Sequence, residues 1–250
     1  MDLGIGGRTA LVLGASRGIG RGIAAALARE GARVAIASRS RERVVATADE
    51  IEGEVDAFEA DTEDLERLAS LPEAVEGELG PVDILVTNTG GPPHGGALDN
   101  AAEEWERAYR SLVLAPRVLA EAAVSGMRDR GWGRIVNVSS SSVREPIPHL
   151  TLSNAHRMAA VGFFKTLASE VAGDGITVNT VATGRFATDR LASNWGSWEE
   201  MERGAADGVP AGRLGQPEEY GDLVAFLCSE RAAYLTGTVI PLDGGLLHGV

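Results

Sequence analysis

Short apolar runs alternate with longer segments of helical periodicity along most of the chain. The first run, Thr9-Ala10-Leu11-Val12-Leu13, is apolar at nearly every position, which is typical of a strand buried on both faces. Similar runs predict strands at residues 33–37, 55–59, 83–87, 133–139, 176–181 and 239–242. Helical patterns predict helices at residues 21–30, 41–52, 63–78, 102–130 with a bend near Pro116, 152–172 and 217–229.

This alternation predicts an α/β fold built from βαβ units. No repeat, low-complexity tract or linker divides the 250 residues, so we expect one domain over residues 1–250. The expected architecture is a Rossmann-type, doubly wound parallel sheet with helices on both faces. Ligands of such sheets bind beyond the carboxyl ends of the strands. The segments that follow the strands are therefore the candidate site: residues 14–20, 38–39, 61–62, 88–93, 139–142 and 183–188.

A glycine-rich turn connects the first predicted strand to the first predicted helix. Gly14, Gly18 and Gly20 follow a G-x-x-x-G-x-G spacing. Glycines allow backbone amides to approach a phosphate, and they allow a helix to pack closely on a strand. The N-terminus of the helix adds unpaired N–H groups and partial positive charge. A strand before the turn and a helix after it favour a dinucleotide site over an ordinary turn.

Composition indicates an ordinary globular protein, with 44% hydrophobic and 24% charged residues. The formal net charge of −13 argues against nucleic acid or an anionic membrane as a partner. Cys228 is the only cysteine, which excludes an intrachain disulfide and suits a reducing compartment. The first residues resemble no signal peptide, and no apolar run is long enough for a membrane span. We therefore expect a cytoplasmic protein.

Several motifs, in this order along nearly the whole chain, resemble the short-chain dehydrogenase/reductase family and its 3-oxoacyl-carrier-protein reductases. The resemblance implies a cofactor site. The residues of this site would be Gly14, Ser16, Arg17, Gly18, Ile19 and Gly20 in the turn, Asp61 and Thr62 at the adenine, Asn88 and Gly90 after the fourth strand, and Gly184 and Thr188 near the nicotinamide. Residues 212–219 and 243–245 resemble the family's C-terminal landmarks. Thr183 stands where proline is usual.

The residues after the second strand favour NADP(H) over NAD(H). NAD-preferring sites place a carboxylate there, whereas a 2′-phosphate needs cations. This chain has Ser38 and Arg39 at that place and Arg17 in the glycine turn. A guanidinium binds phosphate through two parallel hydrogen bonds. The alternative is that both arginines are merely solvated surface charges.

The resemblance also implies four catalytic positions, of which three carry unusual residues. Ser140 takes the serine position, Ser153 the tyrosine position and Arg157 the lysine position, where it would also hold the cofactor. The asparagine position falls on Leu112. A serine hydroxyl is a far weaker acid than tyrosine and falls about a ring's length short, so we expect a water or a bulkier substrate to fill the gap.

Several other groups are candidate substitutes for the missing proton donor. His156 lies three residues after Ser153, and His149 lies in the segment expected to line the substrate pocket. A histidine pKa suits proton transfer, although a surface histidine is the plainer interpretation of each. The weaker candidates are His94, Tyr109 and the hydroxyls of residues 139–142, and no argument supports His248. No residues have metal-ligand spacing, so no metal is expected.

Two functional hypotheses remain open. The first is an NADP(H)-dependent oxidoreductase with an altered catalytic site, acting on a carbonyl or alcohol of a small-molecule substrate. The second is a catalytically silent NADP(H)-binding sensor or partner subunit. The resemblance implies a homotetramer or dimer, and a substrate lid at about residues 188–208. Trp195 and Trp198 of that lid would contact an apolar ligand, a neighbouring subunit or the protein core.

Overall fold

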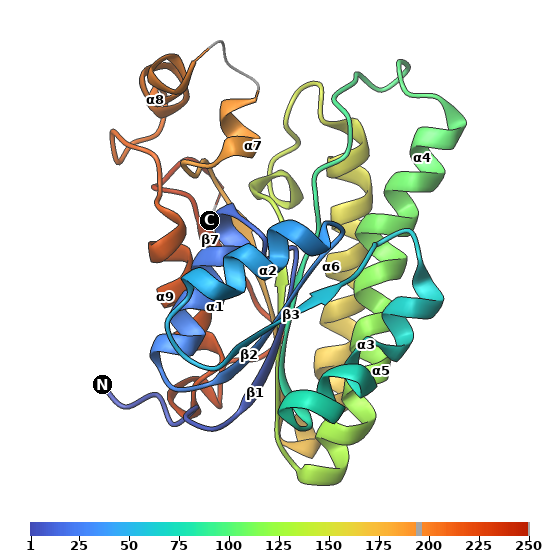
Figure 1. The fold of residues 1–250 in the computed structure, drawn as a ribbon. Helices are drawn as coiled ribbons and strands as arrows, with labels where there is room; N and C mark the ends of the chain where they lie inside the picture. The colour runs from blue at the N-terminus through green and yellow to red at the C-terminus, as the bar shows by residue number, and fades with distance from the viewer. Residues whose placement is uncertain (194–196, 250) are drawn as a thin grey trace.

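A parallel β-sheet of seven strands, in the order β3-β2-β1-β4-β5-β6-β7, forms the centre of the molecule (Figure 1). The computed structural model describes residues 1–193 and 197–249. The strands are β1 (Thr9–Leu13), β2 (Arg33–Ser38), β3 (Val55–Glu59), β4 (Val82–Asn88), β5 (Gly133–Val138), β6 (Ile176–Thr183) and β7 (Val239–Leu242). This confirms the predicted fold class, and every predicted strand is present to within two residues.

Helices cover both faces of the sheet (Figure 1). One face carries α1 (Gly18–Arg29), α2 (Arg41–Glu50) and α9 (Pro217–Leu227). The other carries α3 (Leu65–Leu79), α4 (Ala102–Tyr109), α5 (Ala115–Arg130) and α6 (Thr151–Val171). Two short helices, α7 (Asp189–Ala192) and α8 (Trp198–Ala206), lie beyond the carboxyl edge of the sheet.

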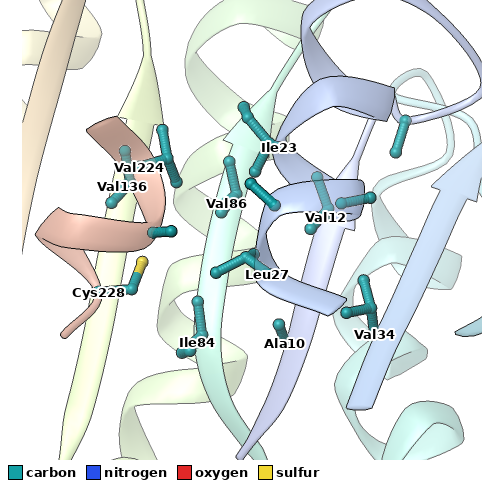
Figure 2. Close-up of a cluster of buried hydrophobic side chains, with 14 of the residues drawn as sticks. Ala10, Val12, Ile23, Leu27, Val34, Ile84, Val86, Val136, Val224 and Cys228 are labelled. Carbon is teal, nitrogen blue, oxygen red and sulfur yellow. The ribbon is translucent and has the colours of Figure 1, made fainter. Parts of the chain in front are cut away.

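Alternating side chains of each strand enter two separate cores, one on each face. Ala10 and Val12 of β1 face α1 and α9, where Ile23, Leu27 and Val224 pack against them (Figure 2). Leu11 and Leu13 of the same strand belong to the core beneath α3, α5 and α6. The near-continuous apolar run that predicted this strand therefore reflects burial on both sides.

The long predicted helix over residues 102–130 is interrupted. A π-helical turn, Arg110–Leu114, separates α4 from α5. Pro116 is the second residue of α5 and lies two positions after this turn. The expected bend is thus a change of helix type a few residues earlier.

Residues 188–208, the polar segment expected to form a substrate lid, contain two short helices in the part that the structure describes. Thr188 accepts a hydrogen bond from Leu191 N and caps α7, and Ser197 accepts one from Glu200 N and caps α8. Met201 and Ala205 bury one side of α8 in a small separate core. Trp195 lies outside the described residues.

Candidate functional site

The glycine turn between β1 and α1 is packed so closely that side chains are excluded. Gly14 has φ +66°, and a Cβ there would fall 2.3 Å from the carbonyl oxygen of Asn88. A Cβ on Gly20 would fall 2.3 Å from the carbonyl oxygen of Gly14. The Asn88 amide donates to that same oxygen at 3.0 Å, which ties the end of β4 to the turn. The structure thus brings together three of the predicted cofactor residues.

The N-terminus of α1 is not capped by any side chain of the described residues. Arg17 precedes the helix in extended conformation, and no side chain caps the first turn, which also contains no acidic residue. The carbonyl of Ser16 accepts a hydrogen bond from Thr47 Oγ1 at 2.9 Å, which fixes the turn against α2. Free amides at a helix start form an anion site. This cradle fits the pyrophosphate of a dinucleotide.

The segment after β6 lies against this cradle. A Cβ on Gly18 would lie 3.3 Å from the methyl group of Thr188. A Cβ on Gly184 would fall 2.5 Å from Asp243 Cα, so only glycine fits beside β7. Arg17 and Asp189 form an exposed ion pair at 3.5 Å between the turn and α7. The glycine turn and the start of α7 are therefore in contact.

The opposite end of the cradle holds the residues expected at the adenosine. Ser38 is buried at the end of β2, and its hydroxyl donates to Ser40 O at 3.3 Å. Arg39 is exposed and has no hydrogen-bond or ion-pair partner among the described residues. The Asp61 carboxylate accepts the backbone N–H of Glu63 at 3.0 Å, and Thr62 beside it is half-buried. Arg39 is thus free to meet a phosphate.

The candidate catalytic positions converge from β5 and α6. Ser140 follows β5, and its hydroxyl accepts the N–H of Ser142 at 3.1 Å. Ser153 is buried in the first turn of α6, and its hydroxyl has no hydrogen-bond partner among the described residues. Arg157 lies one turn further and donates to the carbonyl oxygens of Val138 (3.0 Å) and Gly90 (3.3 Å). Its side chain therefore bridges the ends of β5 and β4.

The guanidinium of Arg157 sits in an electrostatically unusual place. Burial lowers its pKa to about 10, and the positive charge of Arg190 acts in the same direction. Arg157 remains protonated at neutral pH. It supplies a half-buried positive charge at the carboxyl edge of the sheet.

Two further hydroxyls near Ser140 are buried and lack partners. Ser139 and Ser142 are 5% and 2% exposed, and the Oγ atom of each makes no hydrogen bond to any described residue. Unpaired buried hydroxyls are rare because desolvation without a partner costs free energy. These two hydroxyl oxygens are enclosed by the protein.

The histidines proposed as substitute proton donors lie in different environments. The His156 ring packs against Trp105 of α4 at 5.1 Å between centroids, and its Nδ1 is 2.7 Å from Leu152 O. This arrangement favours a packing role between α4 and α6. His149 is exposed and has φ +60°, a left-handed conformation that is rare for residues other than glycine. His94 is exposed in the loop after β4.

Leu112, at the expected asparagine position, lies in the π-helical turn. It is 2% exposed and packs with Ala108, Leu152 and Trp105. An apolar side chain in this cluster offers no hydrogen bond to a water. Tyr109, one turn earlier, is 46% exposed, and its ring centroid lies 6.1 Å from that of His156.

The remaining candidates carry no site chemistry in the described part of the chain. Trp198 is exposed and donates to Glu202 within α8 at 3.2 Å. His248 contacts Glu145, whose pKa is lowered because it accepts the backbone N–H groups of His248 and Gly249. Within residues 1–193 and 197–249, no cluster of three or more acidic, histidine or cysteine side chains is arranged for a metal ion. No described helix is both long and apolar enough to cross a membrane.

Comparisons with known proteins identify the family. Residues 14–247 match the family model described as enoyl-(acyl carrier protein) reductase. The 3-oxoacyl-[acyl-carrier-protein] reductase FabG of Haemophilus influenzae is 35% identical over 240 residues, covering 96% of this chain and 98% of FabG. The chain belongs to the short-chain dehydrogenase/reductase family. Human dehydrogenase/reductase SDR family member 4 is 34% identical over 95% of this chain and 87% of its own length.

Solved structures agree with this assignment. L-sorbose reductase from Gluconobacter frateurii, determined with NADPH and L-sorbose, superposes with a TM-score of 0.94. It is 33% identical, and the match covers 100% of both chains. The members of the short-chain dehydrogenase/reductase family that this chain resembles are thus NAD(P)-dependent reductases.

Sequence reasoning missed two polar features of the site. Arg190 of α7 donates to Pro92 O at 3.1 Å and so contacts the loop after β4. The buried hydroxyl of Tyr220 in α9 pairs with Thr183 Oγ1 at 2.9 Å. Burial raises the pKa of Tyr220, so its phenol stays neutral. The unusual Thr183 was visible in the sequence, but its partner 37 residues away was not.

Proposed function

We propose that this protein is an NADP(H)-dependent oxidoreductase that acts on a carbonyl or alcohol substrate with an altered catalytic site. The observation that carries the proposal is the side-chain-free cradle of Gly14 and Gly20 in front of the uncapped α1 N-terminus. The reductases among its relatives support it. When bound, the nicotinamide would supply or accept the hydride.

The chain's own residues would bind and orient the reactants. Gly14, Ser16, Gly18, Ile19 and Gly20 would present backbone amides to the pyrophosphate. Asp61 and Thr62 would hold the adenine, Asn88 and Gly90 after β4 would also contact the cofactor, and Gly184 and Thr188 would hold the nicotinamide. Arg157, held by two carbonyl oxygens, would bind ribose hydroxyls and place a positive charge near the reacting atoms.

Proton transfer would not follow the usual tyrosine route. Ser140 would orient the substrate oxygen, and Ser153 would hold a water in the space that a phenol ring would fill. A hydroxyl donor of such weak acidity forgoes general acid assistance worth about 10²–10⁴-fold. We therefore propose slow reduction of simple ketones, with the proton delivered from water or from the substrate.

Preference for NADP(H) follows from Arg39. Arg39 directly follows β2, which ends at Ser38. Its exposed guanidinium has no partner among the described residues. Arg17 would assist, although it would first have to leave Asp189. A 2′-phosphate would gain charge-assisted hydrogen bonds there that a 2′-hydroxyl would not.

A second candidate function is a silent NADP(H)-binding sensor or partner subunit. The observation that favours it is the combination of Ser153, Arg157 and the buried apolar Leu112 at three catalytic positions. It predicts NADP(H) affinity without turnover.

Turnover of NADPH against ketones, aldehydes, sugars and 3-oxoacyl thioesters separates the two functions. The oxidoreductase predicts substrate-dependent NADPH oxidation above background. Absence of turnover across the panel by a folded protein that binds NADPH would contradict it and support the sensor.

The double variant Ser153→Tyr with Arg157→Lys tests the assignment of positions. We expect it to raise ketone reduction by about 10²–10⁴-fold, because a tyrosine activated by a neighbouring ammonium restores acid catalysis. Ser153→Ala and Arg157→Lys alone are the matched controls. An unchanged rate in the double variant, with NADPH affinity retained, would refute the assignment of these two positions.

The assembly is proposed by resemblance alone. We propose a homotetramer or dimer, with residues 188–208 as the substrate lid. Light scattering at several protein concentrations tests the first statement, and a monomer at all of them would contradict it.

A further inference from the structure

Two guanidinium groups converge on one short loop at the carboxyl edge of the sheet. Arg157 of α6 donates to Gly90 O at 3.3 Å, and Arg190 of α7 donates to Pro92 O at 3.1 Å. The two helices are well separated in sequence, and both approach this edge (Figure 1). A Cβ on Gly91 would fall 2.9 Å from Arg190 Nη2, so the missing side chain leaves the space in which Arg190 lies.

Neither positive charge is neutralised by the protein. Within the described part of the chain, neither Arg157 nor Arg190 forms an ion pair. Asp189, the acidic neighbour of Arg190, pairs with Arg17 instead. The ionisable groups that act on Arg157 are the neutral phenol of Tyr220 and the like charge of Arg190. The positive charge of Arg190 lowers the pKa of Arg157, as a like charge does, and an anion between the two would relieve that repulsion.

The donors of both side chains are largely unused. A guanidinium carries five N–H donors in a planar fork. Arg190 uses its fork for one carbonyl oxygen, and Arg157 donates to two. A planar fork matches the two oxygens of a carboxylate or a phosphate. The two side chains therefore have the charge and the hydrogen-bond donors that binding of an anion requires.

We propose that Arg190 binds an anionic group of the substrate, a carboxylate or a phosphate, and that the positive charge of Arg157 adds to the attraction. This inference rests on the proposed function and narrows its substrate to carbonyl or alcohol compounds that carry such a group. The position supports a substrate rather than a cofactor phosphate. The α1 amides and Arg39 already provide for those phosphates, whereas Arg157 lies one helical turn from Ser153 and contacts the end of β5.

Binding of simple anions tests the site without requiring turnover. Oxalate and inorganic phosphate are titrated by calorimetry into the protein, with and without saturating NADP⁺. We expect Arg190→Gln to weaken oxalate binding by about tenfold to a hundredfold, which is the range for hydrogen bonds to a charged group. Arg190→Lys keeps the charge without the fork, and its affinity should fall between those of wild type and Arg190→Gln.

Arg203→Gln is the matched control, because Arg203 is an exposed arginine on the neighbouring helix α8. It should leave oxalate binding unchanged, and neither Gln variant should alter NADP⁺ affinity. Thermal melting of each variant confirms folding.

Equal oxalate affinity in wild type and Arg190→Gln, or no oxalate binding by wild type, would overturn the proposal. A fall in NADP⁺ affinity without a change in oxalate affinity would assign Arg190 to the cofactor and also overturn it. Failure of the wild type to bind NADP⁺ would instead refute the proposed function, and the oxalate titration of the free protein would still decide the anion site.

Discussion

Replacing Gly20 with alanine tests the closest contact in the candidate site. The new Cβ would stand 2.3 Å from Gly14 O and 2.8 Å from Asn88 Nδ2. Carbon and oxygen atoms make ordinary contact at about 3.4 Å, so α1 would have to move away from the turn by about 1 Å. The first contact is with backbone, which has little room to yield.

Two opposing effects set the size of the change. Overpacking of this kind costs about 1–3 kcal/mol, whereas alanine within a helix gains about 0.5–1 kcal/mol over glycine. The net loss is at most about 2.5 kcal/mol, and the melting temperature falls by about 2–4 °C for each kcal/mol in a chain of this size. Cofactor affinity should fall more sharply. A shift of 1 Å breaks one or two amide hydrogen bonds to a phosphate, which weakens binding about tenfold to a hundredfold.

Gly77→Ala provides the matched control. Gly77 lies within α3, is exposed, and a Cβ there would meet nothing within 4 Å. That variant should be more stable than wild type by about 0.5–1 kcal/mol and should bind NADPH unchanged. Thermal melts and NADPH titration of both variants are the assay. A Gly20→Ala protein with wild-type melting temperature and wild-type NADPH affinity would refute the packing argument.

Three further changes test separate parts of the account. Arg39→Ala should weaken NADPH binding about tenfold to a hundredfold and leave NADH binding unchanged, because only the 2′-phosphate loses charge-assisted bonds; equal losses for both cofactors would contradict the NADP(H) preference. Hydrogen bonds from Arg213, at 2.6 and 2.7 Å, lower the pKa of Glu219 to about 2. The pair therefore stabilises the folded protein above pH 4.5, which is about the pKa of this carboxyl group in the unfolded chain. This stabilisation disappears as the pH falls toward 2. Glu219→Gln should lower the free energy of unfolding at pH 7 by no more than about 1 kcal/mol, since the pair is largely exposed, and should flatten the melting profile between pH 5 and 2; an identical profile in both proteins would count against this. Tyr220→Phe leaves Thr183 Oγ1 without its partner and should cost about 1–2 kcal/mol in thermal unfolding, a loss that would be absent if the pair contributed nothing.

The sheet could be predicted from the sequence because each strand is buried on both faces. Continuous apolar runs such as residues 9–13 leave few alternatives when glycines and helical patterns separate them. Helix ends were predicted less well. The first helix starts at Gly18 rather than residue 21, since its opening residues are the glycines of the turn itself. Pro116 indicated an irregularity in the helix over residues 102–130, but the sequence does not show that it takes the form of a π-helical turn.

The close-packed glycine turn could be predicted because it depends on backbone geometry. Only glycine fits at positions 14 and 20, because the turn lies against the end of β4 and against the start of α1. A requirement for glycine can be recognised in the sequence. Contacts such as those between Arg190 and Pro92, or between Glu145 and the backbone of His248, join positions far apart in the chain. Polar contacts of this kind follow from the fold and leave no local pattern.

The packing role of His156 was hidden for a similar reason. Its spacing from Ser153 allowed a place in the cleft, but Trp105 and Tyr109 of a different helix enclose its ring. Only the relative position of α4 and α6 distinguishes these two environments.

Titration of the purified protein with NADPH and NADH, followed by calorimetry and by thermal melting, tests the central claim most directly. The account predicts saturable binding of NADPH, tighter than that of NADH, and a melting temperature that rises with cofactor concentration. Absence of binding by both dinucleotides to the folded protein would contradict the nucleotide site at the glycine turn, and with it both proposed functions.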